Sequence, residues 1–138
     1  MSAADILPGL LQWYENLSPE TLPAIRTLYS DPTYFRDPFN EFRGRDQVEQ
    51  LFTDMFRKLD KPRFTITDTV SQDNAAFLVW NFDFAVRGRA IQIVGTSHLK
   101  FDTQGRVCYH RDYWDAAEEL YEKLPLAGFL LRQLKKLV

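Results

Sequence analysis

The N-terminal part of the chain carries apolar residues at helical spacing, which predicts helices over residues 1–30 and 45–60. Ser2 and Asp5 form a capping-box pattern at the start of the first helix. Ser18-Pro19-Glu20 combines a cap, a proline and an acid in the order that typically opens a second helix. The helix over 45–60 has the clearest apolar stripe, whose members we interpret as core residues: Val48, Leu51, Phe52, Met55, Phe56 and Leu59.

Strand patterns follow the helices. Asp31-Pro32 is expected to end the first helical region, because the residue before a proline avoids helical geometry, and residues 33–39 predict a short strand. From 62 to 115 the period changes to two, with turn-forming residues between four apolar runs, which predicts an antiparallel meander. Gly95 lies inside the third run and predicts a bend or bulge. Residues 116–138 predict a C-terminal helix that closes the open end of the fold.

Length and composition limit the class of protein. The 138 residues suffice for one domain, and we expect residues 1–138 to form it. The net charge of -2 disfavours a nucleic-acid interface, and no apolar run approaches the ~20 residues that a membrane span needs. The single cysteine, Cys108, excludes an internal disulfide and favours a cytoplasmic protein. With two histidines and no glycine-rich phosphate loop, we expect neither a metal nor another cofactor.

The last predicted strand carries polar residues where a buried strand would carry aliphatic ones. At alternate positions, Cys108, His110, Asp112 and Trp114 share one face. A buried charge is costly unless it is paired, so this face either meets water or lines a pocket. His110 and Asp112 are close enough to pair, and such a pair serves either structure or catalysis.

The order of elements and several short motifs resemble the SnoaL-like and ketosteroid-isomerase-like members of the nuclear transport factor two superfamily. The matching residues are Tyr14, Phe35-Arg36-Asp37-Pro38, Gly44-Arg45, the run from Phe101 to Val107, and Tyr113-Trp114. The resemblance implies an α+β cone-shaped half-barrel, whose curved mixed or antiparallel sheet wraps around three N-terminal helices under a C-terminal helical lid. It also implies a homodimer through the sheet. This fold hosts isomerases, hydrolases, cyclases and inert binding modules, so it defines no reaction by itself.

The resemblance to steroid isomerases places a catalytic base at Asp37 and an oxyanion-binding tyrosine at Tyr14. The second oxyanion donor of those enzymes, a protonated aspartate, falls on Ser97 in this chain. Loss of a strong donor from such a site typically costs ~10²–10³ in rate. Steroid isomerisation is therefore disfavoured, whereas proton transfer beside a carbonyl remains chemically open.

A second resemblance is to limonene-epoxide-hydrolase-like proteins, which have catalytic acids at the positions of Asp83 and Asp112. Asn81 stands where those proteins have a bridging arginine. Two neighbouring carboxylates without a cation between them tend to share a proton. Asp83 would then be a neutral donor, and Asp112 would be the base that activates water.

Together these patterns predict a protein with a pocket for a small hydrophobic molecule, and proton transfer of the isomerase or cyclase type on a cyclic substrate. The expected catalytic residues are Asp37, Tyr14 and Asp112, and the expected pocket residues are Phe35, Asn81, Asp83, Ser97, His110 and Trp114. The alternatives are an epoxide hydrolase that uses Asp83 with Asp112, and a non-catalytic binding or dimerisation module. The outward residues expected at the dimer interface include Trp80, Phe82 and Thr96.

Overall fold

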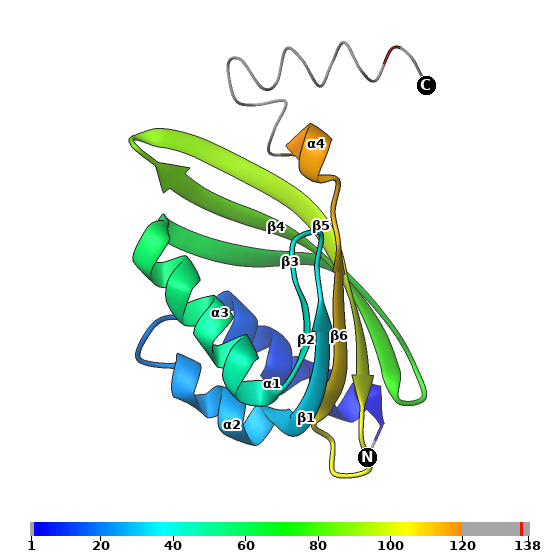
Figure 1. Cartoon of the computed structure of the whole chain (residues 1–138). Coiled ribbons are helices and arrows are strands. Elements are labelled where there is room, and N and C mark those ends of the chain that lie inside the picture. The colour runs from blue at the N-terminus through cyan, green and yellow to red at the C-terminus, as the bar shows by residue number, and fades with distance from the viewer. Residues whose placement is uncertain (1, 120–135, 137–138) are drawn as a thin grey trace.

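The computed structural model describes residues 2–119 and 136, which form one curved six-stranded sheet with helices against its inner face (Figure 1). The strand order is β2-β1-β6-β5-β4-β3, in which β1 and β6 run parallel and the other neighbours run antiparallel. The strands are β1 (Tyr29–Arg36), β2 (Glu41–Arg43), β3 (Asp60–Gln72), β4 (Ala75–Val86), β5 (Arg89–Phe101) and β6 (Val107–Tyr113). The helices are α1 (Ala3–Glu15), α2 (Ile25–Leu28), α3 (Arg45–Lys58) and α4 (Ala116–Glu119), with a 3₁₀ turn over Leu22–Ala24. This architecture confirms the predicted α+β cone.

The strands from β3 to β6 form the predicted antiparallel meander. Burial alternates along β4 and β5, so one set of side chains faces the helices and the other faces outward. Trp80 and Phe82 belong to the helix-facing set, and the expectation that they face a partner copy is therefore wrong. Trp80 pairs with Gly95 in an uninterrupted register, so the expected bulge at Gly95 is absent from this strand pair.

The second helix is shorter than predicted. α2 ends at Leu28, and β1 already begins at Tyr29, so Asp31 and Pro32 lie within a strand. The register of β1 against β6 shifts between Tyr29 and Tyr34, around the proline that cannot donate a backbone hydrogen bond. Tyr29 is fully buried and forms hydrogen bonds to other buried side chains. These tertiary contacts override the helical spacing of the local sequence.

Contacts at both ends hold α1 against the sheet. Ser2 and Asp5 form the predicted capping box, and the Ala3 amide donates to the Asp73 carbonyl at 2.8 Å. At the other end, Glu15 Oε2 accepts a hydrogen bond from the Ile66 amide at 3.0 Å. The helix is therefore fixed across the inner face of the sheet, with Tyr14 buried beneath it.

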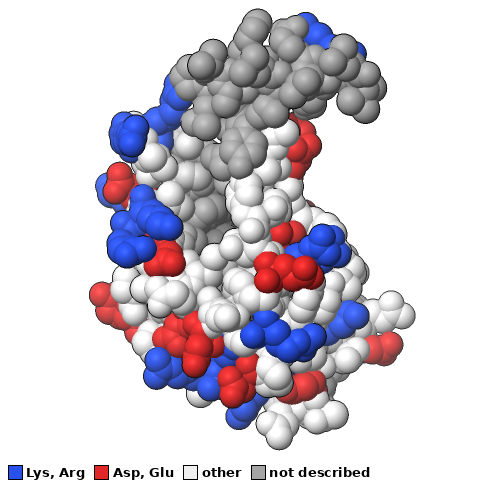
Figure 2. Space-filling view, viewed as in Figure 1, with Lys and Arg blue, Asp and Glu red and all other residues white. Residues whose placement is uncertain are grey.

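The predicted C-terminal helix over 116–138 is described only through α4, and the rest of that range, apart from Lys136, lies outside the described residues. In the part of the chain that the structure describes, no helix is long and apolar enough to cross a membrane. Acidic and basic side chains are interspersed over the helical part of the surface in Figure 2.

Candidate functional site

The polar residues of β6 meet a polar residue of β5 inside the cone. His110 Nε2 lies 2.7 Å from Asp112 Oδ1, and Ser97 Oγ donates to the same carboxyl oxygen at 2.5 Å. The His110 side chain is 4% exposed and that of Asp112 is 19% exposed. Among the described residues, both hydrogen bonds to Asp112 end on Oδ1. Its second oxygen, Oδ2, accepts no hydrogen bond from the described residues.

Trp80 holds Ser97 in place. The indole Nε1 donates to Ser97 Oγ at 2.9 Å, and the ring lies directly over Gly95 on the neighbouring strand. A Cβ atom at Gly95 would lie 2.6 Å from Cζ2 of Trp80 and still closer to Cη2, distances at which atoms overlap. Glycine is required at position 95 because a residue without a Cβ lets the indole reach Ser97. This close contact, and not a bulge, accounts for a glycine inside the strand.

Two buried tyrosines continue the hydrogen-bonded line beyond His110. Tyr29 Oη lies 2.8 Å from His110 Nδ1, and the Tyr14 and Tyr29 hydroxyls form a short hydrogen bond with each other. The line thus passes through Tyr14, Tyr29, His110, Asp112 and Ser97, and joins α1 to three strands of the sheet.

Burial raises the pKa of both tyrosines, because the charged phenolate loses its hydration inside the protein. The negative charge of Asp112 raises both pKa values further. A raised phenol pKa favours the neutral form, so Tyr14 and Tyr29 keep their protons at neutral pH. Each hydroxyl can therefore donate one hydrogen bond, to one partner at a time.

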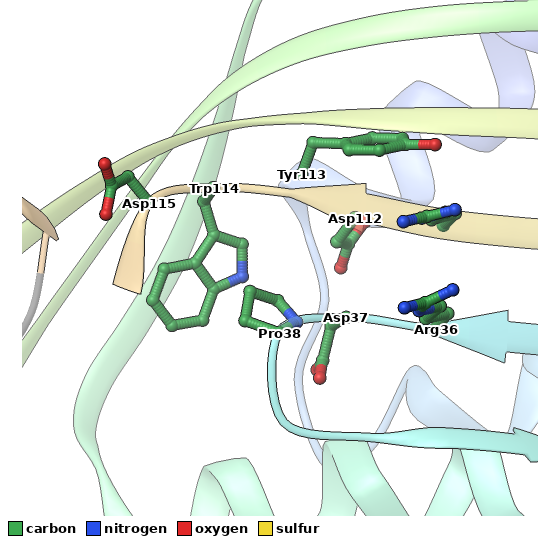
Figure 3. Close-up of a pocket in the computed structure, with 8 residues that line it drawn as sticks. Arg36, Asp37, Pro38, Asp112, Tyr113, Trp114 and Asp115 are labelled. Atoms are coloured by element: carbon green, nitrogen blue, oxygen red, sulfur yellow. The ribbon is translucent and has the colours of Figure 1, made fainter. Parts of the chain in front are cut away.

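Asp112 lies between two spaces of different character. A small, partly open space of about 40 Å³ has a mainly apolar lining and is here called the polar cavity after its four polar residues Tyr14, Ser97, His110 and Asp112; Phe52, Phe64, Ile66, Leu78 and Trp80 complete its lining. An open space of about 580 Å³, here called the open cleft, is lined by Arg36, Asp37, Pro38, Arg111, Asp112, Tyr113, Trp114 and Asp115 (Figure 3). The polar cavity has room for a water molecule or one small functional group, whereas the open cleft has room for a ring.

The structure separates the two residues expected to act as base and oxyanion donor. Tyr14 lines the polar cavity, and Asp37 lines only the open cleft at the end of β1. Asp37 Oδ1 accepts hydrogen bonds from the backbone amides of Phe39 and Asn40 at 2.8 and 2.7 Å, and the Asn40 side chain contacts both carboxyl oxygens. Asp37 therefore stabilises a turn, a role that Asp-Pro sequences often have. Asp112 is the acid that shares a cavity with Tyr14.

Asn81 and Asp83 do not face the cavity. They alternate with Trp80 and Phe82 on β4 and so lie on the outer face of the sheet, where Gln92 Nε2 donates to Asp83 Oδ1 at 2.9 Å. Asp112 lies on the inner side with the buried Ser97. The proposed pairing of Asp83 with Asp112 is therefore wrong, because the sheet stands between the two carboxylates.

Two aromatic residues of the predicted set lie beside the site. Phe35 is fully buried, and its ring packs edge-on against His110 at a centroid distance of 4.9 Å. It supports the imidazole and does not line the polar cavity. Trp114 lines the open cleft beside Pro38 and contacts the ring of Phe39 at 5.5 Å (Figure 3). Neither ring fills the space next to Asp112.

Sequence patterns had no signal for two members of the site. Tyr29 falls within the range 1–30 that was predicted to be helical, and the partners of its hydroxyl come from distant parts of the chain. Trp80 is surrounded by apolar residues of β4, and its bond to Ser97 depends on strand register. Both residues were therefore placed by tertiary structure.

Other reactive groups of the chain offer less. Burial raises the pKa of the Cys108 thiol, and its sulfur contacts the Lys100 carbonyl at 3.4 Å. A raised thiol pKa disfavours the reactive thiolate. Within residues 2–119, no three His, Cys, Asp or Glu side chains gather closely enough to hold a metal ion.

The fold and the site together define a cone-shaped α+β protein with a polar cavity under its sheet. The chain belongs to the SnoaL-like domain family, whose sequence profile matches residues 10–110. No curated protein sequence matches the chain. The family and the fold confirm the resemblance that the motifs indicated.

Solved structures of similar fold come from several bacteria. An NTF2-like protein of unknown function from Burkholderia pseudomallei is 14% identical with a TM-score of 0.71, over 83% of this chain and 92% of that chain. A protein with a ketosteroid isomerase-like fold from Catenulispora acidiphila, in complex with trimethylamine, is 14% identical with a TM-score of 0.70, over 87% of this chain and 92% of that chain. A LEH-like epoxide hydrolase from M. tuberculosis is 17% identical with a TM-score of 0.70, over 95% of this chain and 94% of that chain. At these identities the likeness shows the fold alone.

Proposed function

We propose that this protein catalyses proton transfer on a small, hydrophobic, cyclic carbonyl compound, with Asp112 as the general base. The observation that supports this role most directly is the arrangement of its carboxyl group. Ser97 and His110 hold Oδ1, Oδ2 accepts no hydrogen bond from the described residues, and Asp112 lines both the open cleft and the polar cavity. A base with a fixed orientation at the border of a cleft is what abstraction of a carbon-bound proton needs.

The neighbouring residues have complementary roles in this proposal. Ser97 and His110 orient the carboxylate of Asp112, and Tyr14 supplies a hydroxyl that lines the same cavity. Negative charge that develops on a carbonyl oxygen is stabilised when the Tyr14 hydroxyl donates to it, which requires that Tyr29 in turn donates its proton to Tyr14. Proton transfer of this kind requires no cofactor.

The dimensions of the two spaces indicate how a substrate would lie. The open cleft, at about 580 Å³, accommodates a ring against Trp114 and Pro38. The polar cavity, at about 40 Å³, accommodates only the carbonyl oxygen. The proposal therefore selects compact cyclic ketones over substrates that would need a large enclosed chamber.

The direct test is isomerisation of 3-cyclohexen-1-one to its conjugated isomer, followed by ultraviolet absorbance. We expect the protein to accelerate the reaction in the absence of any added cofactor. Exchange of the α-hydrogens for deuterium in D₂O provides a second readout that does not depend on the double bond. Absence of both activities would favour the alternative of a non-catalytic binding module.

The size of the polar cavity supports a second candidate, hydrolysis of a small epoxide with Asp112 as the only acid. The cavity volume of about 40 Å³ fits one water beside the carboxylate. The fold similarity to an epoxide hydrolase is consistent with this chemistry. Formation of the diol from cyclohexene oxide in ¹⁸O-labelled water, measured by mass spectrometry, distinguishes it from ketone isomerisation.

We also propose that the protein forms a homodimer through the outer face of its sheet. Four exposed apolar residues of that face, here called the outer patch, support this proposal: Val70, Phe77, Val94 and Tyr113. Large exposed apolar side chains gathered on one face are typical of protein interfaces.

Charge placed in the outer patch tests the dimer. The wild-type protein is expected to sediment as a dimer at micromolar concentration, and Phe77→Glu is expected to shift it to monomer because a charge cannot be buried unpaired. Phe39→Glu, which changes another exposed ring, one that contacts Trp114 and lies outside the outer patch, serves as the control and should stay dimeric. A wild-type monomer would contradict the proposal.

A further inference from the structure

Tyr29 occupies the middle of the hydrogen-bonded line between the polar cavity and His110. Its hydroxyl contacts the Tyr14 hydroxyl on one side and His110 Nδ1 on the other, at 2.8 Å. Tyr29 is fully buried and lines none of the spaces around the site, so it does not touch a ligand itself. The titratable groups that contact the His110 side chain are Tyr29, Asp112 and the ring of Tyr14.

When the imidazole is neutral and Asp112 is ionised, the hydrogen bonds of the line can point in only one direction. His110 Nε2–H then donates to Asp112, so Nδ1 is an acceptor and takes the proton of Tyr29 as its hydrogen bond. The oxygen of Tyr29 accepts from the Tyr14 hydroxyl. Tyr14 therefore presents only its oxygen lone pairs to the polar cavity, and suits a ligand that donates a hydrogen bond.

The arrangement reverses when the imidazole is protonated. Both ring nitrogens then donate, and Nδ1–H points at the oxygen of Tyr29. Tyr29 must turn its own proton toward Tyr14, its only other partner among the described residues. Tyr14 can then direct its proton only into the polar cavity that it lines. This state suits a ligand with an oxyanion, and the positive imidazole is paired with Asp112.

We propose that Tyr14, Tyr29 and His110 form a proton relay that ionises an acidic hydroxyl group, such as an enol or a phenol, in the polar cavity. The ligand O–H bond breaks and its proton passes to Tyr14, the proton of Tyr14 passes to Tyr29, and the proton of Tyr29 forms the new Nδ1–H bond of His110. The ligand is left as an oxyanion that accepts a hydrogen bond from Tyr14. The same steps in reverse return a proton to the oxygen.

The relay adds a step to the proposed function. Its enol ligand rests on that function, because an enol is the intermediate of proton transfer beside a carbonyl. Tyr29 is in this scheme a positioning residue, because it acts only through its two neighbours. A purely structural tyrosine would leave the ionisation of a bound ligand unchanged. The ionisation state of the ligand is therefore the quantity to measure.

The test uses 4-nitrophenol, whose ionised form absorbs visible light, at a mildly acidic pH where the free compound is mostly neutral. We expect the wild-type protein to bind it as the phenolate. Tyr29→Phe should lower the ratio of phenolate to phenol in the bound state at least ~10-fold, because the oxyanion then loses the hydrogen-bond network that ends on the protonated His110. Tyr34→Phe, which changes a surface tyrosine bonded to Glu41, is the matched control and should leave the ratio unchanged.

Nitrogen-15 NMR of His110 in the wild-type protein gives a readout that needs no variant. Binding of 4-nitrophenol should increase the doubly protonated fraction of the ring, with the added proton on Nδ1. Nitrobenzene, which lacks the hydroxyl, should cause no change.

The relay is overturned if 4-nitrophenol does not bind, if it binds as neutral phenol, or if His110 stays neutral with phenolate bound. Loss of ketone activity together with an intact His110 response would instead reject only the proposed function.

Discussion

Asp112→Asn is expected to lower kcat/KM for ketone isomerisation at least ~10²-fold, because it removes the general base. The amide has the size of the carboxyl group, and its oxygen can still accept the hydrogen bonds from Ser97 and His110. The fold should therefore survive while the second oxygen, which would receive the substrate proton, is replaced by an NH₂ group. The measurement is the initial rate of 3-cyclohexen-1-one isomerisation, with circular dichroism to confirm folding.

Asp37→Asn is the matched control, since it makes the same chemical change in another acid of the open cleft. Its rate should remain close to that of the wild type, because Asp37 is engaged by its own turn. A large loss in Asp37→Asn together with an unchanged rate in Asp112→Asn would exchange the roles of the two acids. Equal, small effects in both variants would remove Asp112 as the base.

Gly95→Ala is expected to destabilise the protein by about 1–3 kcal/mol, the usual cost of excess volume in a packed core. The new methyl group would overlap the indole of Trp80, whose ring carbon Cζ2 would lie 2.6 Å away. The ring can yield only by leaving its hydrogen bond to Ser97. The change should therefore lower both the free energy of unfolding, measured in urea, and the catalytic rate.

The direction of this effect is diagnostic, because alanine ordinarily stabilises a chain relative to glycine. Gly9→Ala, at an exposed position of α1 where a Cβ meets no atom within 4 Å, should raise the free energy of unfolding by about 0.5–1 kcal/mol. Adding Trp80→Phe to Gly95→Ala should recover part of the lost stability, since the smaller ring leaves room for the methyl group. A stabilising Gly95→Ala would contradict the close packing of Trp80 on the sheet.

Most of the architecture followed from periodicity. The helical stripe around Val48 and Phe52 and the alternation from 62 to 115 each placed an element correctly, because both patterns span many residues and tolerate individual exceptions. The prediction failed at Tyr29, where a short helical pattern competed with pairing to β6. Local spacing is a weak signal when a single buried side chain gains its partners from distant parts of the chain.

The candidate site was harder to predict, because it depends on which face of each strand turns inward. Alternation grouped His110 with Asp112, and that pair is found together. The same rule grouped Asn81 with Asp83, but did not say that their face of β4 points outward. A strand with apolar residues on both faces, such as β4, gives no local sign of its inner face.

The class of fold, the meander and the polar face of the last strand were predictable from the residues alone, since these depend on local periodicity and on residue chemistry. The folded chain was needed to show that Asp112 and not Asp37 shares a cavity with Tyr14, that Tyr29 links that tyrosine to His110, and that Gly95 admits Trp80. These contacts are set by the parallel pairing of β1 with β6 and by the docking of α1, which join residues far apart in the chain.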